Sequence, residues 1–141
     1  MRLFLDSSVV LAACGRPSGA SRAVFDLARP NGWTLLTSRY VLNEVTKNLP
    51  KLRSQALTDW RALSPNLIVT RDVWTMDRPE VFEPAKDRPV LFTAAAWATT
   101  LLTLDAADFG KLTRTGFYHL AVMSPGIFLA SERAAGRLSS Q

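Results

Sequence analysis

Four acidic residues stand at the edges of apolar segments of this chain, where partial burial is expected: Asp6, Glu44, Asp87 and Asp105. The chain has only 12 acidic residues against 17 basic ones, so placing several of them there needs a reason. Partial burial disfavours a carboxylate, and like charges brought together raise each other's pKa. A divalent cation removes both penalties, because Mg²⁺ and Mn²⁺ prefer oxygen ligands. The pattern therefore indicates a metal-dependent active site.

A site of this kind is suited to phosphodiester hydrolysis. Two ions held about 4 Å apart could deprotonate a water molecule and stabilise both the attacking and the leaving oxygen. No side-chain nucleophile is needed for that reaction. His119 is the only histidine of the chain. It stands at the start of an expected core strand, and we assign it a structural role rather than that of a general base.

The elements that must position these acids alternate along the chain. Apolar runs predict strands, and their positions are 3–5, 33–37, 67–70, 100–104 and 119–123. Apolar residues at helical spacing, together with capping residues, predict helices at 8–13, 21–29, 38–49, 51–63, 87–98 and after residue 126. Residues 71–86 show no clear period, and we expect a surface loop or a short irregular helix there.

Alternating strands and helices predict an α/β fold. The strands are continuous apolar runs, which is typical of a parallel sheet covered on both faces. We expect a three-layer α/β/α sandwich around a parallel sheet of four to five strands. Sites in such sheets form beyond the carboxyl ends of the strands, near a topological switch point, where Asp6 and Asp105 are expected. We expect one domain over residues 1–133 and a disordered tail over residues 134–141.

Composition limits the partners and the compartment. The net charge is +5 and the pI is about 10.0, which favours a polyanionic partner such as nucleic acid. Cys14 is the only cysteine, so a reducing compartment fits. Leu11–Cys14 resembles a lipoprotein cleavage site, but Asp6 interrupts the apolar segment before it, and Arg2 is the only basic residue of that leader. No apolar run is long enough for a membrane helix. We expect a cytoplasmic protein.

Several motifs, in this order, resemble the PIN-domain nucleases. They are Leu5-Asp6-Ser7-Ser8, Asn43-Glu44-Val45, Lys86-Asp87-Arg88-Pro89-Val90-Leu91, Leu102-Thr103-Leu104-Asp105-Ala106-Ala107-Asp108-Phe109 and Met123-Ser124-Pro125-Gly126-Ile127-Phe128-Leu129. The resemblance spans about residues 2–128. One departure is Thr99-Thr100, where many relatives have a Gly-Ala turn, and it does not touch the acids.

The resemblance implies a metal-dependent endoribonuclease with a PIN-like fold, often the toxin of a bacterial toxin–antitoxin pair. It implies Mg²⁺ or Mn²⁺ as the cofactor, held directly or through water by Asp6, Glu44, Asp87 and Asp105, with Asp6 central. Asp108 has two roles open to it, as a further ligand or as the residue that helps start a helix. Similar family motifs imply that Ser8 and Thr103 orient Asp6 and Asp105 through their hydroxyl groups.

The expected partners are an RNA substrate, an antitoxin protein and a second copy of the chain. The basic residues nearest the expected acidic mouth are Arg16, Arg22, Lys86, Arg88 and Lys111. We expect them to contact RNA phosphates. We expect solvated helix faces to carry the basic residues Lys47, Lys51, Arg53 and Arg61. Trp74, in the irregular stretch, is the tryptophan best placed to stack on a base or to contact a partner.

Two other functions compete with the nuclease. A catalytically inactive PIN fold could serve as an RNA- or protein-binding module, but a surface that binds RNA works better without a cluster of carboxylates. A phosphatase similar to the haloacid dehalogenases would also begin with a strand and an aspartate. That family needs a second aspartate two residues after the first, and here Ser8 occupies the position.

Overall fold

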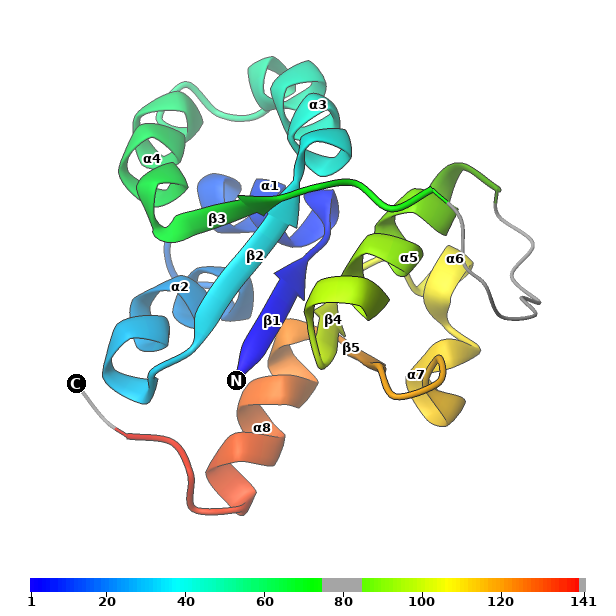
Figure 1. Ribbon diagram of the computed structural model, residues 1–141. Helices are drawn as coiled ribbons and strands as arrows, with labels where there is room; N and C mark the ends of the chain where they lie inside the picture. Colours follow the sequence, from blue (N-terminus) through cyan, green and yellow to red (C-terminus); the bar gives the residue numbers. More distant parts are fainter. Residues whose placement is uncertain (75–84, 140–141) are drawn as a thin grey trace.

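Apolar strands form a parallel, five-stranded sheet in the order β3-β2-β1-β4-β5 (Figure 1). The structure is a computed structural model, and it describes residues 1–74 and 85–139. The strands are β1 Arg2–Leu5, β2 Thr34–Ser38, β3 Leu67–Thr70, β4 Thr100–Leu102 and β5 Ala121–Met123. β1 lies in the middle, with β2 and β4 on either side. Strands β2 and β3 are added on one side of β1, and β4 and β5 on the other side. The strand order therefore reverses between β1 and β4, which is the topological switch point of the sheet.

Eight α-helices and three short 3-10 helices connect the strands within the described residues. Side-chain oxygens of Asp6, Ser38 and Ser124 cap the helices that follow them, each accepting a hydrogen bond from a backbone N–H. The α-helices are α1 Ser7–Gly15, α2 Ala20–Asn31, α3 Arg39–Asn48, α4 Ala56–Leu63, α5 Arg88–Trp97, α6 Ala106–Phe109, α7 Leu112–Thr115 and α8 Pro125–Ala134. The 3-10 helices are η1 Leu49–Lys51, η2 Ser64–Asn66 and η3 Ala85–Asp87.

Helices lie on both faces of the sheet, with α5 on the opposite face from α1 and α2 (Figure 1). The central strand β1 is fully apolar after its first residue, and Leu3, Phe4 and Leu5 are completely buried. Helix α8 packs against α2, and the rings of Trp33 and Phe128 meet edge-on at 4.9 Å beside this contact. The predicted three-layer α/β/α sandwich with a parallel sheet is confirmed.

The predicted helix over 51–63 is wrong in its first half. Residues 49–51 form η1, and α4 begins only at Ala56. Arg53 explains the difference, because its guanidinium donates hydrogen bonds to the carbonyl oxygens of Gly15 (2.8 Å) and Cys14 (3.2 Å) and pairs with Asp59. The intervening turn is therefore tied to the carbonyl end of α1. Arg53 was expected on a solvated helix face; it is exposed, but it stands in the turn before α4 and not on a helix.

The remaining predictions of secondary structure differ from the structure mainly at element ends. Strand 67–70 is confirmed in full, whereas β4 and β5 are shorter than predicted. Of the irregular stretch 71–86, only residues 71–74 and 85–86 are described, and the prediction for the rest lies outside the described residues. The domain boundary at residue 133 stays a prediction. Helix α8 runs to Ala134, and the Ser139 N–H donates to the Asn31 side chain at 2.7 Å.

None of the helices within residues 1–74 and 85–139 has the length and apolar character needed to cross a membrane.

Candidate active site

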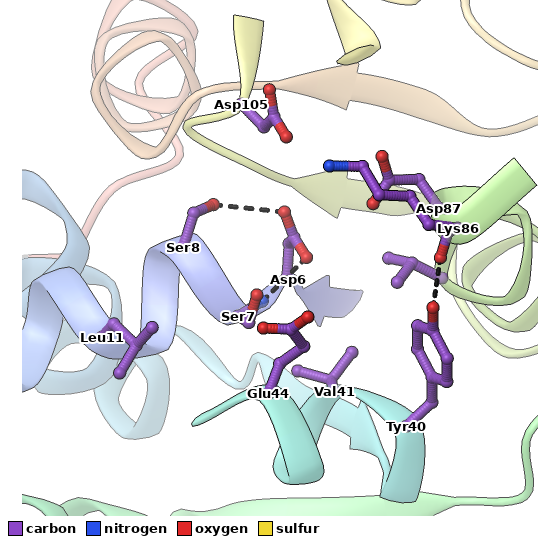
Figure 2. A pocket seen from close by; sticks show the side chains of 11 residues that line it. Asp6, Ser7, Ser8, Leu11, Tyr40, Val41, Glu44, Lys86, Asp87 and Asp105 are labelled. Carbon is purple, nitrogen blue, oxygen red and sulfur yellow. Dashed lines mark hydrogen bonds between the residues drawn. The ribbon is translucent and has the colours of Figure 1, made fainter. Parts of the chain in front are cut away.

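The carboxyl ends of β1 and β4 meet at the switch point, and acidic residues follow both strands. Asp6 comes directly after β1, and its N–H donates to the Leu102 carbonyl at 3.0 Å. Asp105 follows β4 after a turn of two residues. A cavity of about 260 Å³ opens beside them (Figure 2) and is lined by Asp6, Ser7, Ser8, Leu11, Tyr40, Val41, Glu44, Lys86, Asp87, Val90 and Asp105. The four acids singled out in the sequence therefore lie around one cavity.

Asp6 is the most buried of the four acids, with 6% of its surface exposed. Its Oδ1 accepts from the Ser7 N–H at 2.8 Å, and its Oδ2 accepts from the hydroxyl groups of Ser8 at 3.1 Å and Thr103 at 2.8 Å. Burial raises the pKa of Asp6, and these hydrogen bonds oppose that rise because they stabilise the carboxylate. The side chain is thus held in one orientation by three donors.

Ser8 and Thr103 also join the two loops that carry the acids. The Ser8 hydroxyl accepts from the Leu104 N–H at 3.0 Å, and the Thr103 hydroxyl accepts from the Asp105 N–H at 3.0 Å. Both hydroxyl groups donate to Asp6, and Thr103 reaches Asp105 only through its backbone. Their predicted role in orienting the acids remains a prediction, and these contacts are consistent with it for Asp6.

A second group of acids is formed by Asp87, Asp105 and Asp108. One carboxylate oxygen from each lies within 4.8 Å of the others, a spacing that could hold a metal ion. Asp105 caps α6, since its Oδ1 accepts from the Asp108 N–H at 3.1 Å. Asp108 thus starts the helix with its backbone while its carboxylate faces the other two. Of the two roles left open for Asp108, this geometry favours that of a ligand.

The electrostatics of this group centre on Asp87. Burial, a hydrogen bond with Asp108 and the Asp108 charge raise the pKa of Asp87 to about 7. The same hydrogen bond lowers the pKa of Asp108. Two neighbouring carboxylates do not both ionise easily, so below a pH of about 7 Asp87 carries a proton and donates a hydrogen bond to Asp108. Asp87 Oδ2 is buried and has no hydrogen-bond partner among the described residues. A buried oxygen without a partner is costly, and a cation would satisfy it.

Helix α3 forms the opposite wall of the cavity. Glu44 is exposed, and its Oε2 accepts from the Asn48 side chain at 3.1 Å. Tyr40 lies one turn earlier on the same helix face, and its hydroxyl donates to the Lys86 carbonyl. The Tyr40 ring also packs edge-on against Trp74 at 5.4 Å. Tyr40 is not among the site residues predicted from the sequence, although its spacing of four residues from Glu44 places the two on one helix face.

The expected RNA-contacting residues are not all at the cavity. Lys86 lines it. Arg22 instead donates to the Ala13 carbonyl at 3.3 Å and pairs with acidic residues, Asp26 and Asp59. The other three lie outside the cavity lining: Arg16 is exposed after α1, Arg88 is partly exposed at the first residue of α5, and Lys111 is exposed before α7. Their contacts with RNA stay predictions.

Solved structures resemble this arrangement of elements. No family model matches the chain, and no curated protein matches its sequence. A chain from the crystal structure of VapBC2 from Rickettsia felis bound to a DNA fragment from their promoter aligns with a TM-score of 0.61 and 17% identity. The alignment covers 86% of this chain and 97% of that chain. The chain has a PIN-like fold. The resemblance noted in the sequence is thereby confirmed for the fold.

VapC20 from Mycobacterium tuberculosis, described as a Sarcin-Ricin loop cleaving toxin, aligns with a TM-score of 0.45 and 19% identity. That alignment covers 82% of this chain and 95% of that chain. A TM-score of this size does not establish a shared fold. Because the identity is low in both alignments, neither specifies which residues of this chain act.

The donors around Asp6 lead to a test of its environment. We expect Thr103→Val to raise the pKa of Asp6 further, because a hydrogen bond that stabilises the carboxylate is lost. Titration of the side-chain carboxyl carbons by NMR, in the metal-free protein, measures this directly. Thr113→Val is the control, since the Thr113 hydroxyl donates to the Gly110 carbonyl. An unchanged Asp6 titration in Thr103→Val would contradict the assigned contact.

The Asp87 proton leads to a pH-dependent stability. The folded pKa of about 7 exceeds the ordinary value of 3.8, so the folded protein binds more protons than the unfolded chain between these values. The free energy of unfolding of the metal-free protein should therefore fall as pH rises from about 4 to about 7. We expect Asp87→Asn to show a shallower fall. Urea unfolding in chelator at several pH values measures it, and parallel curves for the two proteins would refute the assignment.

Proposed function

We propose that this chain is an endoribonuclease that hydrolyses RNA phosphodiester bonds with Mg²⁺ or Mn²⁺, and that it is the toxin of a toxin–antitoxin pair. The observation that carries the proposal is the convergence of Asp6, Glu44, Asp87 and Asp105 on one cavity at the switch point of the sheet. These acids come from four separate segments of the chain. Stability alone gives no reason to gather like charges in this way.

The residues fit a divalent cation. All the candidate ligand atoms are carboxylate oxygens, which Mg²⁺ and Mn²⁺ prefer. The buried Asp87 Oδ2 has no hydrogen-bond partner among the described residues. We assign Asp87, Asp105 and Asp108 as ligands, with Asp6 and Glu44 binding directly or through water. When bound, the ion supplies charge neutralisation at the phosphodiester and lowers the pKa of the attacking water.

The chain's own residues bind and orient the substrate. The net charge of +5 attracts the polyanionic RNA to the protein. Lys86 is the basic residue of the cavity lining and is placed to contact a phosphate. Trp74 is 60% exposed and stands beside Tyr40, where a base could stack on its indole. Ser8 and Thr103 hold Asp6 in its orientation while the substrate binds.

The toxin role rests on the family resemblance and on the fold shared with a chain from VapBC2 of Rickettsia felis. An antitoxin protein is the partner that this role requires. The proposal includes a cytoplasmic location, because the RNA substrate is found there. It also includes assembly with a second copy of the chain. Growth and co-purification experiments test the toxin role and the antitoxin partner.

The nuclease proposal is tested with the variant Asp6→Asn. We expect Mn²⁺-dependent cleavage of a single-stranded RNA by the wild-type protein, loss of cleavage in chelator, and at least about a 100-fold lower rate for the variant. The control is Asp26→Asn, which changes an acid on α2, outside the cavity lining, by the same chemistry. Circular dichroism checks that both variants fold. Full activity in Asp6→Asn would refute the mechanism, and RNA binding without turnover in the wild type would identify a binding module.

The toxin proposal is tested by expression in bacteria. We expect the wild-type chain to arrest growth and Asp6→Asn to permit it, because the toxic effect is attributed to cleavage. Co-expression of the small protein encoded by the neighbouring gene should restore growth and co-purify with the chain. Unaffected growth on expression of a soluble, RNA-cleaving wild-type protein would contradict the toxin role while leaving the nuclease proposal in place.

A further inference from the structure

The ammonium group of Lys86 lies among the acids of the cavity. Its Nζ is 3.4 Å from Asp108 Oδ2, and the side chain lines the cavity with Asp87 and Asp105. Figure 2 shows the Lys86 nitrogen pointing into the space between the β1 and β4 loops, not away from it. A positive charge of the chain itself therefore occupies the region where the carboxylates would hold a metal ion.

The backbone of Lys86 is fixed, whereas its side chain is free to move. The Tyr40 hydroxyl donates to the Lys86 carbonyl, and Lys86 lies within η3, directly before Asp87. The Lys86 side chain is 74% exposed, and among the described residues the ammonium is held near the acids by its ion pair with Asp108. A long, flexible stem on a fixed backbone lets the ammonium leave without disturbing Asp87.

The ammonium shares its surroundings with several carboxylates. It pairs with Asp108, whose carboxylate lies close to those of Asp87 and Asp105. Lys86 thus lowers the cost of gathering these carboxylates when no metal ion is bound.

We propose that Lys86 is a resident counter-ion of the acidic cavity, which a divalent cation must displace in order to bind. This inference rests on the proposed function, because it concerns the same metal site. Lys86 is a positioning residue in this role: it sets the affinity of the site for the ion and moves out of the cavity on binding. The displaced ammonium then lies at the mouth, where it can meet a substrate phosphate.

The expected size of the effect follows from the exposure of the pair. An exposed ion pair contributes little in water, but a divalent ion feels a nearby positive charge twice as strongly as a monovalent one does. Removing the ammonium should therefore tighten Mn²⁺ binding by about 3- to 10-fold. The Debye length is about 3 Å at 1 M ionic strength, so salt screens the repulsion between the ammonium and the ion. The difference in Mn²⁺ affinity should therefore shrink at high salt.

Mn²⁺ binding to the metal-free protein, followed by electron paramagnetic resonance of the free ion, tests the proposal without any measurement of activity. The variants are Lys86→Met, which removes the charge, and Lys86→Arg, which keeps it. Lys51→Met is the matched control, since Lys51 is exposed, contacts Asn48 and lies outside the cavity lining. Each protein is titrated at low salt and again in 1 M salt.

We expect Lys86→Met to bind Mn²⁺ about 3- to 10-fold more tightly than wild type at low salt. Lys86→Arg and Lys51→Met should stay within about 2-fold of wild type, because neither removes the charge at the cavity. Equal affinity of wild type and Lys86→Met would overturn the counter-ion role and leave the metal site standing. Absence of Mn²⁺ binding in both proteins would overturn the proposed metal site together with the inference.

Discussion

Repulsion among carboxylates at the carboxyl ends of β1 and β4 is the constraint on which the rest of this structure depends. The parallel sheet places Asp6 and Asp105 side by side, because their strands are neighbours at the switch point. Helix α3 then brings Glu44, and the 3-10 helix η3 brings Asp87, to the same cavity. Folding must offset the energy of gathering these charges, and each polar contact around the cavity contributes to that.

The contacts answer the repulsion in different ways. Three donors stabilise the buried carboxylate of Asp6 and oppose the rise in its pKa that burial causes. The pKa of Asp87 is raised to about 7, so below that pH it carries a proton and no charge. Lys86 supplies a positive charge beside Asp108. Asp87 Oδ2 is the only buried side-chain nitrogen or oxygen atom without a hydrogen-bond partner among the described residues. A divalent cation would replace the proton and the ammonium together, which links metal binding to both protonation and side-chain movement.

The sequence predicts the fold and the acids better than it predicts the walls of the cavity. Continuous apolar runs such as 3–5 define the strands, and an acid directly after a strand lies at a known edge of a parallel sheet. Tyr40 escaped notice because local pattern does not reveal that its hydroxyl reaches Lys86, far along the chain. The contacts of Arg53 escaped notice for the same reason, since its partners on α1 are distant in sequence. Charged side chains with long-range partners look like ordinary surface residues in the sequence.

The account depends on acidic side chains from separate segments holding a cation together. A crystal structure of the chain soaked in Mn²⁺, with anomalous diffraction recorded at the manganese edge, tests this most directly. We predict a peak within the cavity that Asp6, Glu44, Asp87 and Asp105 line, with carboxylate oxygens as ligands and Lys86 turned outward. An empty cavity at saturating Mn²⁺, or an ion bound only elsewhere on the surface, would contradict the account.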